Sequence, residues 1–170
     1  VMQQSLIIIS FTVILVVVSS HPCFDFSKMS EEELKNVSNN TMKFLSSLTC
    51  ADARDLQIFN VEKAAKGENV ALENLKNRNP QVYAKHTTYM RNVFKTLGEE
   101  GTLFFVKTES LGDALRKEAA QGESMIIEAL KDEYKSLSSE TRANLETEFP
   151  IFRREDALDM IYVRPLLGQK

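Results

Sequence analysis

Apolar residues recur every three or four positions along most of the chain after Ser27, and no stretch sustains an alternation with a period of two. Spacings of three and four place side chains on one face of an α-helix, whereas alternation is the pattern of a half-buried strand. The sequence therefore predicts an all-α fold. Because no internal repeat or low-complexity linker divides the pattern, we expect one helical domain.

Start signals divide this pattern into separate helices. A Ser-x-x-Glu segment at 30–33 and a Thr-x-x-Asp segment at 49–52 have the spacing of capping boxes. In such a box, two side chains satisfy the free N–H groups at a helix start. They predict one helix over 31–48 and a second that ends near Gly67, followed by a short helix over 68–76.

Asn79 and Pro80 begin the clearest amphipathic helix, since Asn can cap a helix and Pro suits its first position. Gly98 is expected to close this helix. Residues 99–121 fit either one helix or two, the second starting near Ser110. Two further helices are expected over 123–137 and 138–149.

The first 24 residues contain no Asp, Glu, Lys or Arg, and residues 6–18 form an apolar run broken only by Ser10 and Thr12. As a helix this run would span about 20 Å, short of the ~30 Å hydrocarbon layer of a bilayer. We therefore expect residues 1–20 to be a secretory signal peptide cleaved after Ser20. Its start lacks the usual positive charge, and the alternatives are an uncleaved anchor or an ordinary buried segment. The predicted parts of the secreted, extracellular chain are a helical domain over 21–152 and a C-terminal extension over 153–170.

Export would place the two cysteines of the chain, Cys23 and Cys50, in an oxidising compartment. An even pair of this kind predicts a disulfide bond within the chain. The alternative is that Cys23 lies in a mobile tail, unpaired or bonded to another chain. A zinc site is not expected from two cysteines and two distant histidines.

Two adjacent patterns for N-linked glycosylation become meaningful if the chain is exported as predicted. Asn36-Val37-Ser38 and Asn39-Asn40-Thr41 both have the acceptor spacing. Asn36 and Asn39 are both expected to lie away from the apolar face of their helix. The sequence therefore predicts a glycan on at least one of them.

The charge balance argues against nucleic acid as a partner. The net charge is −3 at pH 7 and Lys and Arg form no run, whereas a phosphate backbone is bound by a basic patch. The sequence also contains none of the GxSxG, P-loop, HExxH, CxxC or glycine-rich nucleotide-binding motifs. It therefore predicts neither an enzyme nor a bound metal or cofactor.

His86 falls near the middle of the apolar arc of the helix that begins at Pro80. Imidazole is unusual there unless its nitrogens have partners. Three roles are open: a core residue, a polar group that faces a ligand cavity, and a catalytic group. The last would need a nucleophile and an acid beside His86, as in a hydrolase triad.

Three stretches of the sequence resemble one family. Residues 71–83 place a leucine-rich turn, a break and a Pro before an apolar-Tyr pair that opens a long helix. Residues 137–151 begin with Leu-Ser-Ser-Glu and end in Phe-Pro-Ile, and residues 44–52 place leucines before Thr-Cys-Ala-Asp. Over about residues 30–152, the chain resembles the nematode fatty-acid- and retinol-binding protein family.

The resemblance implies a small, secreted, flattened multi-helix bundle that encloses an apolar cavity for fatty acids and retinol-like lipids. We also expect a transient membrane contact when the lipid is exchanged. The chain departs from the family pattern in three places. The region 107–124 is shorter than usual, His86 replaces a commonly apolar residue, and residues 160–170 extend the end.

Periodicity alone does not separate the walls of a cavity from packed core, so the candidate lining is a broad set. It consists of Leu45, Leu56, Phe59, Leu75, Val82, Tyr83, His86, Met90, Val93, Phe94, Leu103, Leu115, Ile126, Leu130, Tyr134 and Phe149. The competing prediction is a secreted helical protein that binds a partner through an apolar groove and carries no lipid. Such a protein would have a filled interior.

Overall fold

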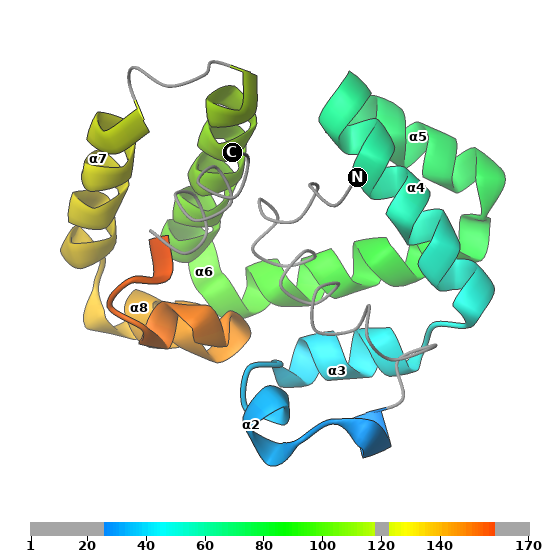
Figure 1. Cartoon of the computed structure of the whole chain (residues 1–170), viewed down its shortest axis with the longest axis horizontal. Helices are drawn as coiled ribbons and strands as arrows, with labels where there is room; N and C mark the ends of the chain where they lie inside the picture. Colours follow the sequence, from blue (N-terminus) through cyan, green and yellow to red (C-terminus); the bar gives the residue numbers. More distant parts are fainter. Residues whose placement is uncertain (1–25, 118–122, 159–170) are drawn as a thin grey trace, which may run out of the picture.

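The computed structural model describes residues 26–117 and 123–158, except for the side chains of Lys28 and of residues 111–126. Every regular element in these two ranges is a helix, so the predicted all-α fold is confirmed (Figure 1). The elements are η1 (Phe26–Lys28), α2 (Glu31–Leu34), α3 (Asn39–Ser46), α4 (Cys50–Lys66), α5 (Glu68–Arg78), α6 (Pro80–Lys117), α7 (Glu123–Ser136), α8 (Ser139–Glu148) and η2 (Pro150–Arg153).

The prediction of one helix over 31–48 is wrong, because the chain leaves the helical conformation between α2 and α3. Ser30 and Glu33 do form a capping box at the start of α2. Ser38 then has extended backbone angles, and its side chain accepts a hydrogen bond from the N–H of Thr41. This second cap starts α3 in a new direction, although the apolar spacing runs on across the break.

Helices α4 and α5 form a hairpin (Figure 1). The predicted Thr49–Asp52 capping box opens α4. Gly67, at φ 88°, makes the turn in a region of backbone angles that favours glycine. At the far end of α5, the guanidinium of Arg78 pairs with Asp55 (3.1 Å) and Glu62 (3.3 Å) of α4. These pairs fix which edge of α4 faces α5.

Helix α6 consists of two straight parts that meet at Gly98, the one residue inside it with non-helical angles (φ 69°, ψ −173°). The glycine therefore closes the first part, as predicted. Of the two alternatives for residues 99–121, one helix is confirmed as far as Lys117. Figure 1 shows α6 turning sharply part-way along its length, so that its second part rises from one end of the first part and the α4–α5 hairpin stands at the other end.

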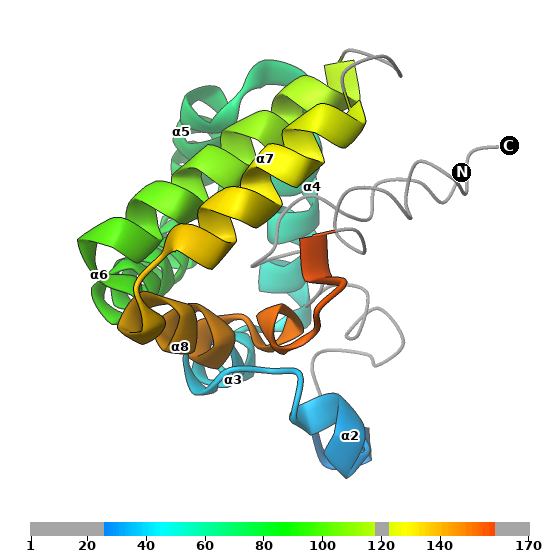
Figure 2. The same cartoon turned by 90° about the vertical axis from the view of Figure 1, so that its left-hand side faces the viewer.

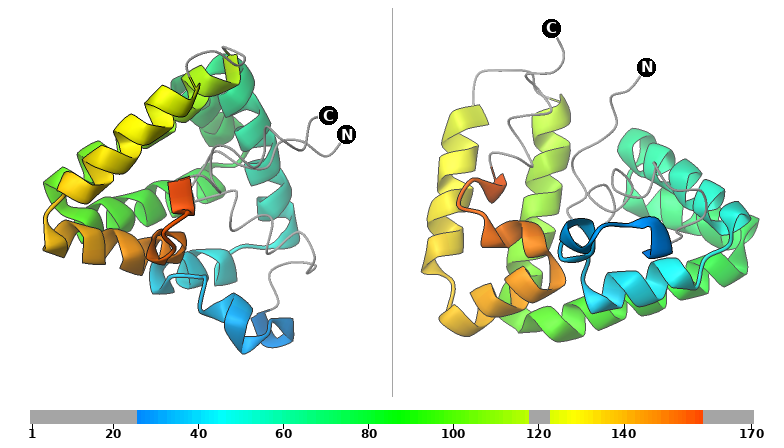
Figure 3. Two further views of the ribbon diagram at one scale, coloured as in Figure 1. Left: turned by 60° about the vertical axis from the view of Figure 1, so that its left-hand side comes forward. Right: turned by 60° about the horizontal axis from the view of Figure 1, so that its bottom comes forward.

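The remaining helices pack on the two parts of α6. Figure 3 shows α3 running along the first part, and Figure 2 shows α7 alongside the second. Helix α8 is tied to the second part by Glu100, which accepts hydrogen bonds from the N-cap Ser138 (Oγ, 2.8 Å) and from Thr141. Gly101 permits this approach, since a Cβ there would lie 3.3 Å from Cγ2 of Thr141.

None of the helices in the described ranges is both long enough and apolar enough to cross a membrane.

Candidate lipid-binding interior

The first aromatic group of the interior lies where α3, α4 and the first part of α6 meet. Phe44 stacks on Tyr89 with ring centroids 4.6 Å apart, and Phe59 lies 5.0 Å from the ring of His86. The hydroxyl groups of Tyr89 and Thr41 are 3.0 Å apart. This polar contact reduces the penalty of burying the tyrosine.

His86 is 4% exposed and lies between the rings of Phe44 and Phe59. Burial, together with the smaller effect of the positive charge of Lys63, lowers the pKa of His86 to about 4. The imidazole is therefore uncharged at neutral pH. This environment favours the first two roles considered for His86 over a catalytic one, because a base with so low a pKa takes up protons poorly at pH 7.

The second aromatic group joins the second part of α6 to α7 and the C-terminal turn. Phe105 stacks on Phe149 with centroids 5.1 Å apart, and Tyr134 stacks on Phe152 at 5.3 Å. Phe104 lies against both Tyr134 (5.8 Å) and Phe152 (6.1 Å). The hydroxyl of Tyr134 donates to Glu146 Oε1 (3.3 Å) at the edge of this group.

A buried cation links α4 to the second part of α6. Lys63 is 8% exposed, and its Nζ lies 3.0 Å from Glu109 Oε2 and 3.2 Å from Glu68 Oε2. Burial by itself would lower the pKa of Lys63, but the two carboxylates outweigh it and raise the pKa above its usual value. The ammonium therefore stays charged, and the ion pairs hold the α4–α5 hairpin to α6.

Most of the predicted lining residues are inside the protein. The buried ones are Leu45, Leu56, Phe59, Leu75, Val82, His86, Val93, Leu130 and Phe149. Tyr83, Met90, Phe94 and Tyr134 are partly buried against the same core. Leu103 is 65% exposed and points away from the core. The side chains of Leu115 and Ile126 lie outside the described residues.

The candidate lining omitted Phe104 and Phe105, which are central to the second aromatic group. Gly101, Phe104, Phe105 and Thr108 are all buried and have the spacing of one helical face. That spacing is the signal that identifies the face. It is weak in the sequence because its first member has no side chain and its last is polar.

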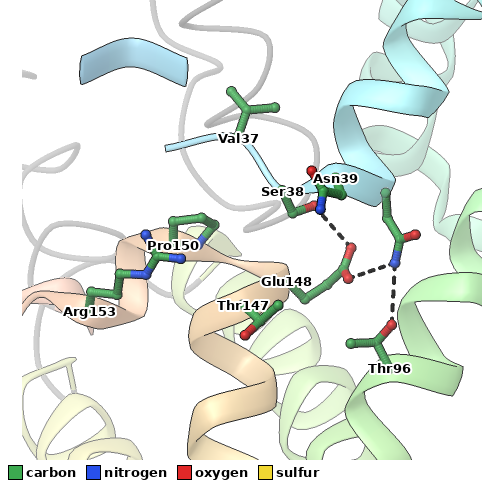
Figure 4. A pocket seen from close by; sticks show the side chains of 9 residues that line it. Val37, Ser38, Asn39, Thr96, Thr147, Glu148, Pro150 and Arg153 are labelled. Atoms are coloured by element: carbon green, nitrogen blue, oxygen red, sulfur yellow. Dashed lines mark hydrogen bonds between the residues drawn. The ribbon is translucent and has the colours of Figure 1, made fainter. Parts of the chain in front are cut away.

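A pocket of about 230 Å³ lies at the junction of α3, the first part of α6 and α8 (Figure 4). Its lining consists of Val37, Ser38, Asn39, Asn40, Thr96, Thr147, Glu148, Pro150 and Arg153. Glu148 accepts hydrogen bonds from Ser38 Oγ (3.2 Å) and Asn40 Nδ2 (2.8 Å). Burial raises the pKa of Glu148 in spite of these bonds. None of the predicted apolar residues borders this polar pocket, which suits an acyl chain poorly.

The predicted modification sites lie close to this pocket or to the start of α4. Asn36 and Asn39 are exposed, whereas Ser38 and Thr41, the hydroxyl residues of their acceptor patterns, are buried. Cys50, the first residue of α4, is disulfide-bonded. Cys23 lies outside the described residues, so its pairing with Cys50 and the occupancy of the glycosylation sites stay predictions.

Taken together, the helices and the two aromatic groups define a small all-α protein with an apolar, aromatic-rich interior. The family model described as nematode fatty acid retinoid binding protein (Gp-FAR-1) matches residues 29–155. The chain therefore belongs to the nematode fatty acid retinoid binding protein family, and the resemblance seen in its sequence is confirmed. Comparison with curated proteins and with solved structures gave no match.

Proposed function

We propose that the protein is a secreted carrier that holds one fatty acid or retinoid molecule in the apolar space between its helices. The membership of the family is the observation that carries this proposal, since the family is one of fatty-acid- and retinoid-binding proteins. The charge-free segment before Cys23 supports the secretion.

The energetics of burial make a lipid a suitable cargo. Each methylene removed from water contributes about 0.8 kcal/mol, so a long acyl chain offers on the order of 10 kcal/mol before immobilisation is subtracted. A helical core whose walls lack contacts regains them when a chain fills the space. The buried side chains Phe59 and Phe105, which belong to the two aromatic groups, are suited to such contacts.

The α4–α5 hairpin and the second part of α6 are the elements we expect to move when a lipid enters. They stand at opposite ends of the first part of α6 and rise from the same side of it (Figure 1), and Lys63 with Glu109 joins them directly. Separation of the two elements would expose Lys63 and Glu109 to water, which would then replace the buried ion pair as the partner of each charge.

Displacement of a fluorescent fatty acid from the mature chain, starting at His21, tests the proposal. We expect oleic acid and retinol to displace the probe at micromolar or lower concentration, and mass analysis of the purified protein to find bound lipid. The variant Phe59→Ala should weaken binding, whereas Val61→Ala, on the exposed side of the same helix, should leave it unchanged. A mature protein that binds no probe and carries no lipid would favour the competing function as a partner-binding helical protein.

A further inference from the structure

We infer that Asn60 is the residue that binds the polar head of the lipid, and that it selects an uncharged hydroxyl over a carboxylate. This inference rests on the proposed function as a carrier. It adds that α4 recognises the head group of the lipid. Among ligands with the same apolar skeleton, the head group then decides which one binds best.

Asn60 lies on the edge of α4 that faces the core. Ala53 packs against the core cluster, and Asn60 follows it by seven residues, about two helical turns, so both point to the same side. Asp55 and Glu62 occupy the opposite edge, where they bind Arg78 of α5. The amide of Asn60 is thus directed away from α5 and lies one turn beyond the buried Leu56.

The amide of Asn60 is buried, and neither its Nδ2 nor its Oδ1 has a hydrogen-bond partner in the described part of the protein. Buried side-chain polar atoms are paired in the large majority of native structures. An amide that lacks partners on both atoms is destabilising, and a ligand that supplies them removes the penalty. The amide of Asn60 is therefore suited to bind a ligand, because the protein itself leaves both of its polar atoms without a hydrogen bond.

The two atoms of the amide distinguish between head groups. Nδ2 needs an acceptor and Oδ1 needs a donor. A hydroxyl group provides both, because its oxygen accepts and its O–H donates. An ionised carboxylate only accepts, so it would satisfy Nδ2 and leave Oδ1 without a donor.

The charges next to Asn60 favour the same choice. Lys63, one turn further along α4, is bound to both Glu109 (3.0 Å) and Glu68 (3.2 Å). This group of three carries a net charge of about −1 when all its members are ionised. A carboxylate bound at Asn60 would add a further negative charge to this part of the protein, whereas a neutral hydroxyl adds none.

Retinol, retinal and retinoic acid share one apolar skeleton and differ only in the head group, so they test the inference directly. Each is used to displace the same bound fluorescent fatty acid from the mature protein. We expect retinol to bind about ten-fold more tightly than retinoic acid, with retinal also weaker than retinol because an aldehyde oxygen only accepts. In Asn60→Leu the three affinities should agree within about two-fold. Asn60→Ala removes the same amide without filling the site, and its three affinities should also agree within about two-fold.

Asn74→Leu is the matched control. It makes the same substitution on α5, where the amide of Asn74 already donates to Glu62 Oε1 (3.0 Å). We expect it to lower the melting temperature and to keep the preference for retinol. Asn60→Leu should do the reverse, with an unchanged or raised melting temperature and no preference.

Two results overturn the inference. One is a wild-type protein that binds the three retinoids equally, and the other is a preference for retinol that survives in both variants of Asn60. In either case the fluorescent fatty acid still binds and the proposed function stands. If the probe does not bind to the wild-type protein at all, the proposed function fails and the inference fails with it.

Discussion

Replacement of Gly98 by alanine should destabilise the protein through the backbone alone. The angles of Gly98 (φ 69°, ψ −173°) lie in a region that is nearly closed to residues with a Cβ. A Cβ built at this position meets nothing within 4 Å, so crowding adds no further penalty. The strain of placing alanine there is about 2 kcal/mol.

For a domain of this size, a loss of that magnitude lowers the melting temperature by roughly 8 °C. Thermal unfolding followed by circular dichroism of the mature chain measures it. Gly67→Ala is the matched control, since Gly67 also has a positive φ and an open Cβ position. Both variants should lose a similar amount of stability.

The two variants should differ in lipid binding. Gly98 sets the angle between the two parts of α6, whereas Gly67 only turns the chain between α4 and α5. We therefore expect Gly98→Ala to weaken the binding of a fluorescent fatty acid and Gly67→Ala to leave it close to the wild-type value. Our reasoning is refuted if Gly98→Ala melts within about 1 °C of the wild type while Gly67→Ala shows the full loss.

Two substitutions of buried titratable groups should change the pH dependence of stability in opposite directions. His86 has a pKa lowered to about 4 in the folded protein. Between pH 6.5 and 4, its imidazole therefore binds a proton in the unfolded chain but stays neutral in the folded chain. Stability should therefore fall by up to about 3 kcal/mol between pH 6.5 and 4, and His86→Phe should remove this part of the fall in urea titrations at several pH values. Glu148 has a raised pKa, so its ionisation opposes folding as the pH rises above 4.5. Glu148→Gln keeps an acceptor for Asn40 and should raise the free energy of unfolding at pH 7 by about 1 kcal/mol, and a clear loss of stability there would contradict this account.

The helix starts were predictable from the sequence because their signals are local. At Ser30, Thr49 and Ser138, the capping side chain and the N–H that it accepts from are three residues apart. The break at Ser38 has the same spacing to Thr41. It was missed because no Glu or Gln completes a capping box there, and because the apolar pattern continues through the break.

The polar contacts of the interior were not predictable, because each joins residues far apart in the chain. Lys63 resembles any surface lysine of α4 until Glu109, 46 positions later, lies beside it. Glu148 likewise depends on Ser38 and Asn40. In these cases the sequence supplies the residue types, and only the packing of the helices decides which of them meet.

The bonds from Ser38 and Asn40 to Glu148 join residues 110 and 108 positions apart. A ribosome makes the chain from its N-terminal end. The contacts between α3 and α8 therefore cannot form until almost all of the domain has been synthesised. During that interval the hydroxyl groups of Ser38 and Thr41 are still accessible, although both are buried afterwards. If Asn36 or Asn39 is glycosylated, as the sequence predicts, we expect the enzyme to act on the nascent chain, before the two ends of the domain come together.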